Sequence, residues 1–275
     1  MTLRLPDLPV APPLFPLDQI LIRVQEELGR RPAWHPLQHW QAPSTRRRDA
    51  RPGVHPSDLD RDCNRAITYA LVGAPRGRQG LSPLEVRRFD HGSVIHAQVQ
   101  GYLIEAAALG LLDFAKVEVE VNAPWLGIDG TTDAIIGHGG YVYDVEVKSA
   151  GPETYYGSSD LKRATRIITT PSASYRKQVH AYMAGTGLRM TAFIYFDKAM
   201  DDVKVIWVPF DDTLWTEIRR EIEHGQEMVR LGALPGKTTK LYQCPRCPFK
   251  DICDKETGLR GVADLRNQAT GPSET

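Results

Sequence analysis

Residues 127–148 read GIDGTTDAIIGHGGYVYDVEVK, and this stretch predicts a β-hairpin. Two apolar, β-prone runs, at 134–136 and 141–143, lie on either side of Gly139-Gly140. Such a glycine pair suits a two-residue turn, because this turn favours residues that adopt a positive φ. We therefore expect two antiparallel strands with the glycine pair at their tip.

The turn fixes which side chains face one another. His138 then faces Tyr141, and stepping outward along the strands brings Asp133 opposite Glu146. Cross-strand partners have Cβ atoms about 4.5–5.5 Å apart and point to the same face. Since side chains alternate along a strand, Lys148 shares the face of Glu146. The opposite face is apolar and suits packing against a helix: Ala134, Ile136, Tyr143, Val145 and Val147.

These polar side chains suggest a chemistry. Two carboxylates at this separation repel each other unless a cation lies between them, and hard cations such as Mg²⁺ or Mn²⁺ prefer oxygen ligands. With a lysine beside them, they form the set of groups that phosphodiester hydrolysis uses, because the metal activates water and stabilises the charge of the transition state. The alternative is a half-exposed hairpin with ordinary surface charges, and a register shift of one residue would reverse every side chain.

The composition is that of a soluble globular protein. The 275 residues are 41% hydrophobic and 25% charged, and 34 basic residues balance 34 acidic ones, so binding to nucleic acid would need a local basic patch. No apolar run is long enough to span a membrane, and prolines interrupt any N-terminal secretory signal. We therefore expect a cytoplasmic protein, or one in the host cytoplasm if phage-encoded. In that compartment four cysteines favour metal binding over disulfides.

The two ends of the chain differ from the middle. Residues 1–55 form a proline-rich, partly irregular arm, apart from a short helix expected from Leu17 to Leu28. The basic run 46–51 either contacts a nucleic-acid backbone or belongs to a solvated linker. Residues 254–275 form a polar tail, which leaves 56–253 as the main domain.

Two helical regions are expected before the hairpin. Ser57 is a good N-cap for a helix over 58–71, which carries Cys63 in its first turns. A second region runs over 82–112, with a break expected near Gly92.

His96 lies one turn after Gly92, so the glycine is expected to clear space beside the imidazole. A histidine on such a helix is often structural. Next to a carboxylate hairpin it is also a candidate ligand for a divalent metal, and the sequence leaves both roles open.

Further elements surround the hairpin. A strand at 117–121 precedes it, and strands at 189–196 and 203–210 and a helix at 213–231 follow as scaffold. A helix over 172–184 places Gln178 and Tyr182 on one face, where they either bind a phosphate or base or pack as ordinary core and surface residues. The loop between the hairpin and this helix either contacts DNA or is a plain surface loop, and its basic residues are Lys162, Arg163 and Arg166.

Near the C-terminus, YQCPRCPFKDICD places Cys244, Cys247 and Cys253 in the spacing C-x2-C-x5-C. Cys63 is the remaining cysteine and would supply the fourth thiolate. Four thiolates suit zinc or an iron–sulfur cluster, and the three-plus-one division favours the cluster, because zinc sites more often pair two C-x2-C units. Four unrelated buried thiols are the alternative.

Together these motifs resemble the RecB-like branch of the PD-(D/E)XK nuclease superfamily. The resemblance is to its iron–sulfur exonucleases, which include CRISPR-associated exonucleases, the AddB nuclease domain and phage relatives. The matching motifs, in order, are Cys63, G-x-x-x-H at 92–96, G-x-x-D at 130–133, E-x-K at 146–148, Q-x-x-x-Y at 178–182 and the three terminal cysteines. They leave about the first fifty residues and the tail unaccounted for.

The resemblance implies an α/β, restriction-endonuclease-like core, in which a mixed central sheet is flanked by helices. It implies that His96, Asp133, Glu146 and the carbonyl of Val147 hold Mg²⁺ or Mn²⁺, and that Lys148 positions or activates the attacking water. Gln178 and Tyr182 would orient the DNA and the lysine. A structural 4Fe–4S cluster on Cys63, Cys244, Cys247 and Cys253 would join the N-terminal helix to the C-terminus.

The implied activity is a metal-dependent DNA exonuclease that acts on single strands or DNA ends. Its setting would be recombination and repair, phage DNA metabolism or CRISPR spacer processing, with DNA and a possible recombination or CRISPR-adaptation protein as partners. The alternatives are a non-catalytic iron–sulfur DNA-binding or partner module and a site-specific endonuclease. Two details depart from the family: Glu146 stands where many relatives have Asp, and Asp144 falls on the metal face by this register.

Overall fold

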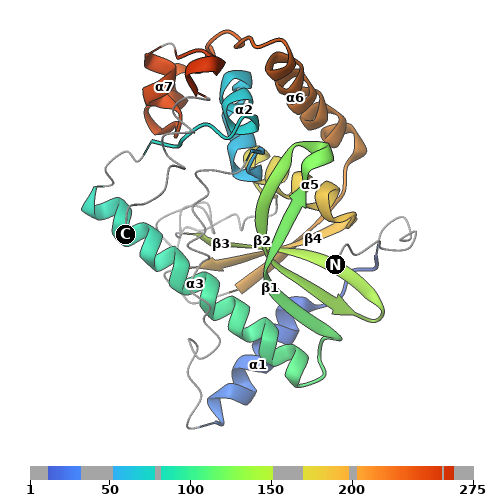
Figure 1. Cartoon of the computed structure of the whole chain (residues 1–275). Helices are drawn as coiled ribbons and strands as arrows, with labels where there is room; N and C mark the ends of the chain where they lie inside the picture. Colours follow the sequence, from blue (N-terminus) through green and yellow to red (C-terminus); the bar gives the residue numbers. More distant parts are fainter. Residues whose placement is uncertain are drawn as a thin grey trace, which may run out of the picture.

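The computed structural model describes residues 12–31, 52–77, 82–150, 170–197, 203–255 and 257–262. These residues form an α/β fold with a five-stranded mixed sheet flanked by helices (Figure 1). None of their helices is long and apolar enough to cross a membrane. Most of the N-terminal arm and of the C-terminal tail lies outside the described residues, as do Lys162, Arg163 and Arg166.

The sheet follows the order of the chain. Its strands are β1 (Phe114–Ala123), β2 (Ile128–His138), β3 (Tyr141–Ala150), β4 (Met190–Asp197) and β5 (Val203–Pro209), side by side in that order. Neighbouring strands are antiparallel, except that β3 and β4 are parallel and the chain crosses between them through a helix. The strands expected at 117–121, 189–196 and 203–210 are therefore confirmed.

The expected hairpin is confirmed with its register. β2 pairs with β3 from His138 opposite Tyr141 to Ala134 opposite Val145. Gly139 and Gly140 form the turn with φ of 59° and 79°, a region that glycine enters without the steric cost that a Cβ imposes.

The described helices surround the sheet. They are α1 (Leu17–Gly29), α2 (Asn64–Leu71), α3 (Pro83–Ala108), α5 (Ala173–Thr186), α6 (Asp212–Arg230) and α7 (Lys250–Asp254). Short 3₁₀ helices are η1 (Pro56–Arg61), η2 (Pro124–Leu126) and η4 (Leu241–Arg246). The expected helices at 17–28, 172–184 and 213–231 are confirmed, and Asp211 caps the last of them through bonds from two backbone N–H groups.

Two apolar layers cover the two faces of the sheet. α1 and α3 pack on one face, where the predicted apolar side of the hairpin is buried: Ala134, Ile136, Tyr143, Val145 and Val147. α5 packs on the other face, against Phe193 and Tyr195 of β4. The alternation of the hairpin thus decides which helices each strand face contacts.

A second core joins distant parts of the chain. At one end of the molecule, near the connection between β1 and β2, lie α2, α6 and the C-terminal segment (Figure 1). This segment comprises η4, α7 and residues 257–262. Tyr69 of α2 packs on Phe249 and donates a hydrogen bond to the carbonyl of Thr257. Arg76 forms a bidentate ion pair with the buried Asp58 and stacks over the same Phe249 ring. The C-terminal segment is therefore held to α2 by direct protein contacts.

The expected helix over 58–71 is wrong in its first half. Residues 56–61 form η1, the chain turns at Asp62, and α2 begins only at Asn64, so that Cys63 lies at the N-cap position. Asp62 has a left-handed φ of 43°, which interrupts a right-handed helix. Its carboxylate is bound by Lys177 and Lys240, and these ion pairs favour the local turn.

The expected break near Gly92 is also wrong. α3 is continuous from Pro83 to Ala108, and Ser82 and Glu85 form a capping box at its start. A Cβ on Gly92 would contact only the Ser149 hydroxyl, at 3.9 Å, so the glycine is not needed to clear space for His96.

The glycine of the G-x-x-D motif has a packing role, which gives a first prediction. A Cβ on Gly130 would lie 2.8 Å from Pro56 Cδ and 3.1 Å from Tyr182 Cε1. We expect Gly130→Ala to lower the free energy of unfolding by roughly 1–3 kcal/mol, because the buried ring must shift. Urea unfolding measures the change, and Gly29→Ala, where a Cβ meets nothing within 4 Å, is the control. Equal stability of the two variants would contradict this packing role.

Candidate active site

The hairpin brings Asp133 next to the backbone of β3. The ladder between β2 and β3 ends at Ala134 and Val145, so Asp133 and Glu146 are the next residues outward. At this point the N–H of Val147 donates to Asp133 Oδ2, at 2.7 Å. The carboxylate of Asp133 is therefore turned towards β3 and towards Glu146.

α3 contacts Asp133 from a second side. His96 Nδ1 lies 3.3 Å from Asp133 Oδ1. One turn further, Gln100 donates to the Asp133 carbonyl at 3.0 Å and to Glu118 Oε1 at 2.7 Å. Helix α3 thus fixes both the side chain and the backbone of Asp133.

Glu118 marks an irregularity beside the site. The β1–β2 ladder runs through Val117 and Val119 and passes over Glu118, whose φ is 50°. A non-glycine residue in this left-handed region is strained, and such strain is often found at functional sites. Gln100 and Glu118 carry no motif, so the sequence did not single them out; a long polar residue one turn after His96 was the available signal.

Glu146 lies at the centre of the cluster. Its side chain is 2% exposed, and its Oε1 accepts hydrogen bonds from Lys148 and from Gln178, the latter at 2.8 Å. Gln178 comes from α5, on the face of the sheet opposite α3. The structure therefore brings together predicted residues from α3, β2, β3 and α5.

The charges shift one another's protonation. Burial and the nearby Asp133 raise the pKa of Glu146 above its ordinary value, although Lys148 opposes this. Burial would also raise the pKa of Asp133, but the charges of His96 and Lys148 outweigh it and lower this pKa. For Lys148, burial favours the neutral amine, yet the two carboxylates outweigh it and raise its pKa. Lys148 therefore carries a positive charge.

The pKa of His96 is also shifted by burial and by the neighbouring charges. Burial alone would lower the pKa of its imidazole, but Asp133 and Glu146 raise it above the ordinary value. Binding a metal through a ring nitrogen requires the neutral imidazole, so it would compete with binding of a proton.

Tyr182 is a buried residue of the second core. Its side chain is 1% exposed and belongs to the second core, where it packs against Gly130 and Pro56. Burial of the ring favours a packing role and leaves it no open face for DNA.

Asp144 lies on the same strand face as Glu146, as the register predicts. It is fully buried, and the hydroxyls of Thr132 and Thr191 donate to its two oxygens at 2.5 and 2.8 Å. Burial raises its pKa to about 7, because the two hydroxyls offset only part of the cost of desolvation.

The donor set suits a hard cation. Within the described ranges, no group of three or more His, Cys, Asp or Glu side chains is arranged to hold a metal ion. Asp133 and Glu146 nevertheless offer carboxylate oxygens, and their mutual repulsion is part of what raises the pKa of Glu146. A divalent cation between them would remove this repulsion, so these two residues fit Mg²⁺ or Mn²⁺.

The four cysteines line a single cavity. Cys63, Cys244, Cys247 and Cys253 all contribute to a space of about 240 Å³ between α2 and the C-terminal segment. Tyr69, Phe249 and Lys237 line it as well, and all four cysteines are free thiols. The cavity therefore brings the four predicted cysteines to one place, between α2 and the C-terminal segment.

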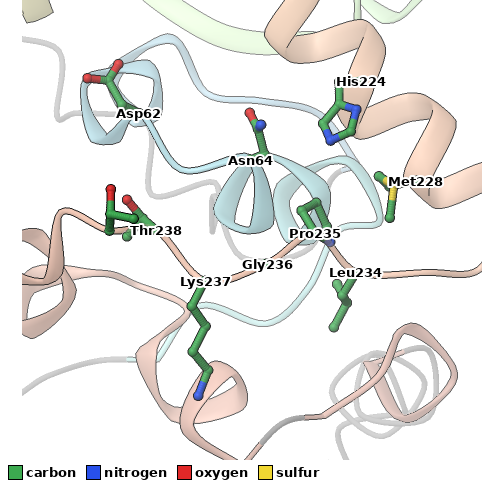
Figure 2. A pocket seen from close by; sticks show the side chains of 10 residues that line it. Asp62, Asn64, His224, Met228, Leu234, Pro235, Gly236, Lys237 and Thr238 are labelled. Carbon is green, nitrogen blue, oxygen red and sulfur yellow. The ribbon is translucent and has the colours of Figure 1, made fainter.

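A second pocket adjoins this cavity, and Figure 2 shows it from close by. It is open, about 550 Å³ in volume, and lies between the start of α2, the helix α6 and residues 234–239. Asn64 and His224 are on its walls, and Lys237 extends away from them and also lines the cysteine cavity (Figure 2). The lining residues include none of those around Asp133, so we assign no function to this pocket.

Comparisons with known proteins give only distant similarities. No protein-family model and no curated protein matches the chain. Among solved structures, the chain is similar to LHK-Exo, an alkaline exonuclease from Laribacter hongkongensis, in complex with dAMP (18% identity, 65% of this chain and 88% of that chain, TM-score 0.46). It is also similar to the crystal structure of SSO0001 (17%, 87% and 96%, 0.40). A phage-related exonuclease from Haemophilus somnus 129PT gives 12%, 62% and 79%, with a TM-score of 0.35. Identities and TM-scores this low do not by themselves assign a function to the chain.

The buried Asp144 gives a second prediction. Its pKa is about 7 in the folded protein against an ordinary value of 3.8, so its contribution to stability is full below about pH 3.8 and is lost as pH rises towards about 7. Asp144→Asn cannot ionise. We therefore expect this variant to exceed the parent in stability by on the order of 2 kcal/mol at pH 8, and by less at pH 5.

Urea unfolding at the two pH values measures this difference. Glu26→Gln, which changes an exposed carboxylate on α1, is the control and should show no such dependence. A stability gain for Asp144→Asn that is the same at both pH values would contradict the linkage.

Proposed function

We propose that this protein is a metal-dependent nuclease that hydrolyses phosphodiester bonds of DNA. The observation that carries the proposal is the convergence of Asp133, Glu146, Lys148 and Gln178 from three elements, with His96 beside them. A buried acidic pair next to a charged lysine is costly for folding and suits binding of a metal and a phosphate. A half-exposed hairpin with plain surface charges would not bury Glu146.

We assign the roles as follows. Asp133 and Glu146 would hold Mg²⁺ or Mn²⁺, with His96 and the carbonyl of Val147 as further ligands; the metal supplies an activated water and charge stabilisation. Lys148 is protonated, so it would orient the water and stabilise negative charge rather than accept a proton. Gln178 would hold Glu146 in place through its amide. We assign Tyr182 a packing role in the domain rather than a contact with DNA.

The order of the sequence motifs from Cys63 to Cys253 supports a more specific proposal. We propose a RecB-like, restriction-endonuclease-like nuclease domain over 56–253 that acts as an exonuclease on single-stranded DNA or DNA ends. Recombination and repair, phage DNA metabolism or CRISPR spacer processing in the cytoplasm would be its setting. Lys162, Arg163 and Arg166 would contact the DNA backbone.

The third prediction tests the reaction. Purified protein with Mn²⁺ should degrade linear single-stranded DNA, and Asp133→Ala or Lys148→Ala should reduce the rate by at least about a hundredfold, because each removes a charge that acts on the transition state. Cleavage of end-labelled DNA, followed with and without EDTA, measures this. Glu217→Ala and Lys116→Ala, which remove exposed charges of the same kind, are matched controls.

The outcomes separate the alternatives. Unchanged cleavage by Asp133→Ala and Lys148→Ala would show that the site is wrongly assigned. Cleavage of closed circular DNA would indicate an endonuclease. Tight DNA binding without cleavage under any divalent metal would favour a non-catalytic module.

We further propose that the four cysteines hold a structural 4Fe–4S cluster. The support is that all four line one cavity, which joins Cys63 to the three cysteines of the C-x2-C-x5-C motif. The cluster would strengthen the contacts that already join α2 to the C-terminal segment.

The fourth prediction concerns this cluster. Protein prepared without oxygen should be brown and contain iron and acid-labile sulfide, and Cys63→Ser should lose both and unfold at lower temperature. DNA cleavage by the folded fraction of this variant should persist, since Cys63 does not contact Asp133 or Glu146. Colourless protein with stoichiometric zinc would overturn the assignment.

A further inference from the structure

Tyr175 covers the lysine of the site. The Lys148 ammonium that binds Glu146 also lies 4.9 Å from the centre of the Tyr175 ring. A cation at this distance over an aromatic face is attracted to the ring's negative face. Tyr175 therefore contacts the central ion pair of the proposed active site, although it belongs to none of the sequence motifs.

The position of this ring is fixed by the start of α5. The Ser172 hydroxyl caps the helix and accepts the Tyr175 N–H, at 3.4 Å. Gln178 lies three residues later, on the same helix face, and binds Glu146. One turn of α5 thus supplies two groups to the Glu146–Lys148 pair: an amide on the carboxylate and a ring on the ammonium.

A row of rings continues from Tyr175 into the sheet. Tyr175 lies 6.4 Å from Phe193, and Phe193 lies 5.9 Å from Tyr195, with interplanar angles of 30° and 19°. Tyr195 lies opposite Lys148 in the β3–β4 ladder. The ring of Tyr175 therefore packs against the rings of the sheet, and this packing sets its orientation.

Tyr195 adds an independent sign of a ligand. The residue is 1% exposed, and its hydroxyl has no hydrogen-bond partner among the described residues. A buried hydroxyl without a partner is costly, so its presence beside a site needs an explanation. The neighbours that raise its pKa, after burial itself, are Tyr175 and Glu146. A polar ligand or water at the site would supply the missing partner.

Tyr175 is also accessible to solvent, since 37% of the residue is exposed. We propose that its ring stacks on the nucleobase next to the scissile phosphate while it holds the Lys148 ammonium. The inference rests on the proposed nuclease function and specifies the substrate: a nucleotide whose base has a free face, as at a strand end or in a single strand. Every base has such a face, so stacking here tolerates any sequence.

The fifth prediction compares the cleavage of two substrates, one with and one without a terminal base. The substrates are two single-stranded oligonucleotides, identical except that one has an abasic residue in place of the terminal nucleotide. The parent should have a kcat/KM about tenfold lower on the abasic substrate, mainly through KM, because one stacking contact is lost. Tyr175→Leu should cleave both substrates equally, and Tyr175→Phe should behave as the parent.

One control and one binding measurement complete the design. Tyr242→Leu, which removes a tyrosine that is 76% exposed on η4, should leave the tenfold ratio unchanged. Binding of the same oligonucleotides is measured by fluorescence anisotropy in the Asp133→Ala background, with and without Tyr175→Leu. This arm does not depend on cleavage.

The results distinguish the two proposals. If Tyr175→Leu keeps the parent's ratio in cleavage and in binding, Tyr175 only packs and the inference is overturned. If the base dependence of binding disappears with the ring but no variant cleaves DNA, the stacking inference stands and the proposed nuclease function fails.

Discussion

The structure depends on the burial of Glu146 next to Asp133. Two carboxylates in a poorly hydrated site repel each other, and the fold opposes this repulsion with Lys148, His96, Gln178 and the Val147 N–H. These groups come from both faces of the sheet and from its middle, so α3, β3 and α5 must all be in place for the pair to be accommodated. The site thus contributes strain, and the apolar layers under α1, α3 and α5 supply the stability that tolerates it.

The sequence could predict much of this because local rules set the hairpin. Gly139-Gly140 determines the turn, the turn determines the register, and the register places Asp133 next to Glu146. The helix starts at Ser172 and Asp211 could also be predicted, since Ser and Asp are residues that commonly cap a helix N-terminus. Such features depend on residues close together in the chain.

What could not be predicted depends on contacts between distant segments. The turn at Asp62 is favoured by lysines 115 and 178 residues away, so a local pattern predicts one long helix where the structure has two short ones. Gln100 and Glu118 pair across α3 and β1 without any motif. Tyr182 shares a helix with Gln178 but points into the second core, because η1 packs against that side of α5. Spacing on one helix does not indicate what covers each face.

The ion pairs of Asp62 link two distant parts of the chain. Its carboxylate binds Lys240, which precedes the cysteine segment, and Lys177, which directly precedes Gln178 on α5 and also pairs with Glu221 of α6. One aspartate is therefore a junction between the C-terminal segment and the helix that carries the amide on Glu146. The segment that leads to Cys244 and the residue next to Gln178 thus share one carboxylate, although Lys177 and Lys240 lie far apart in the chain.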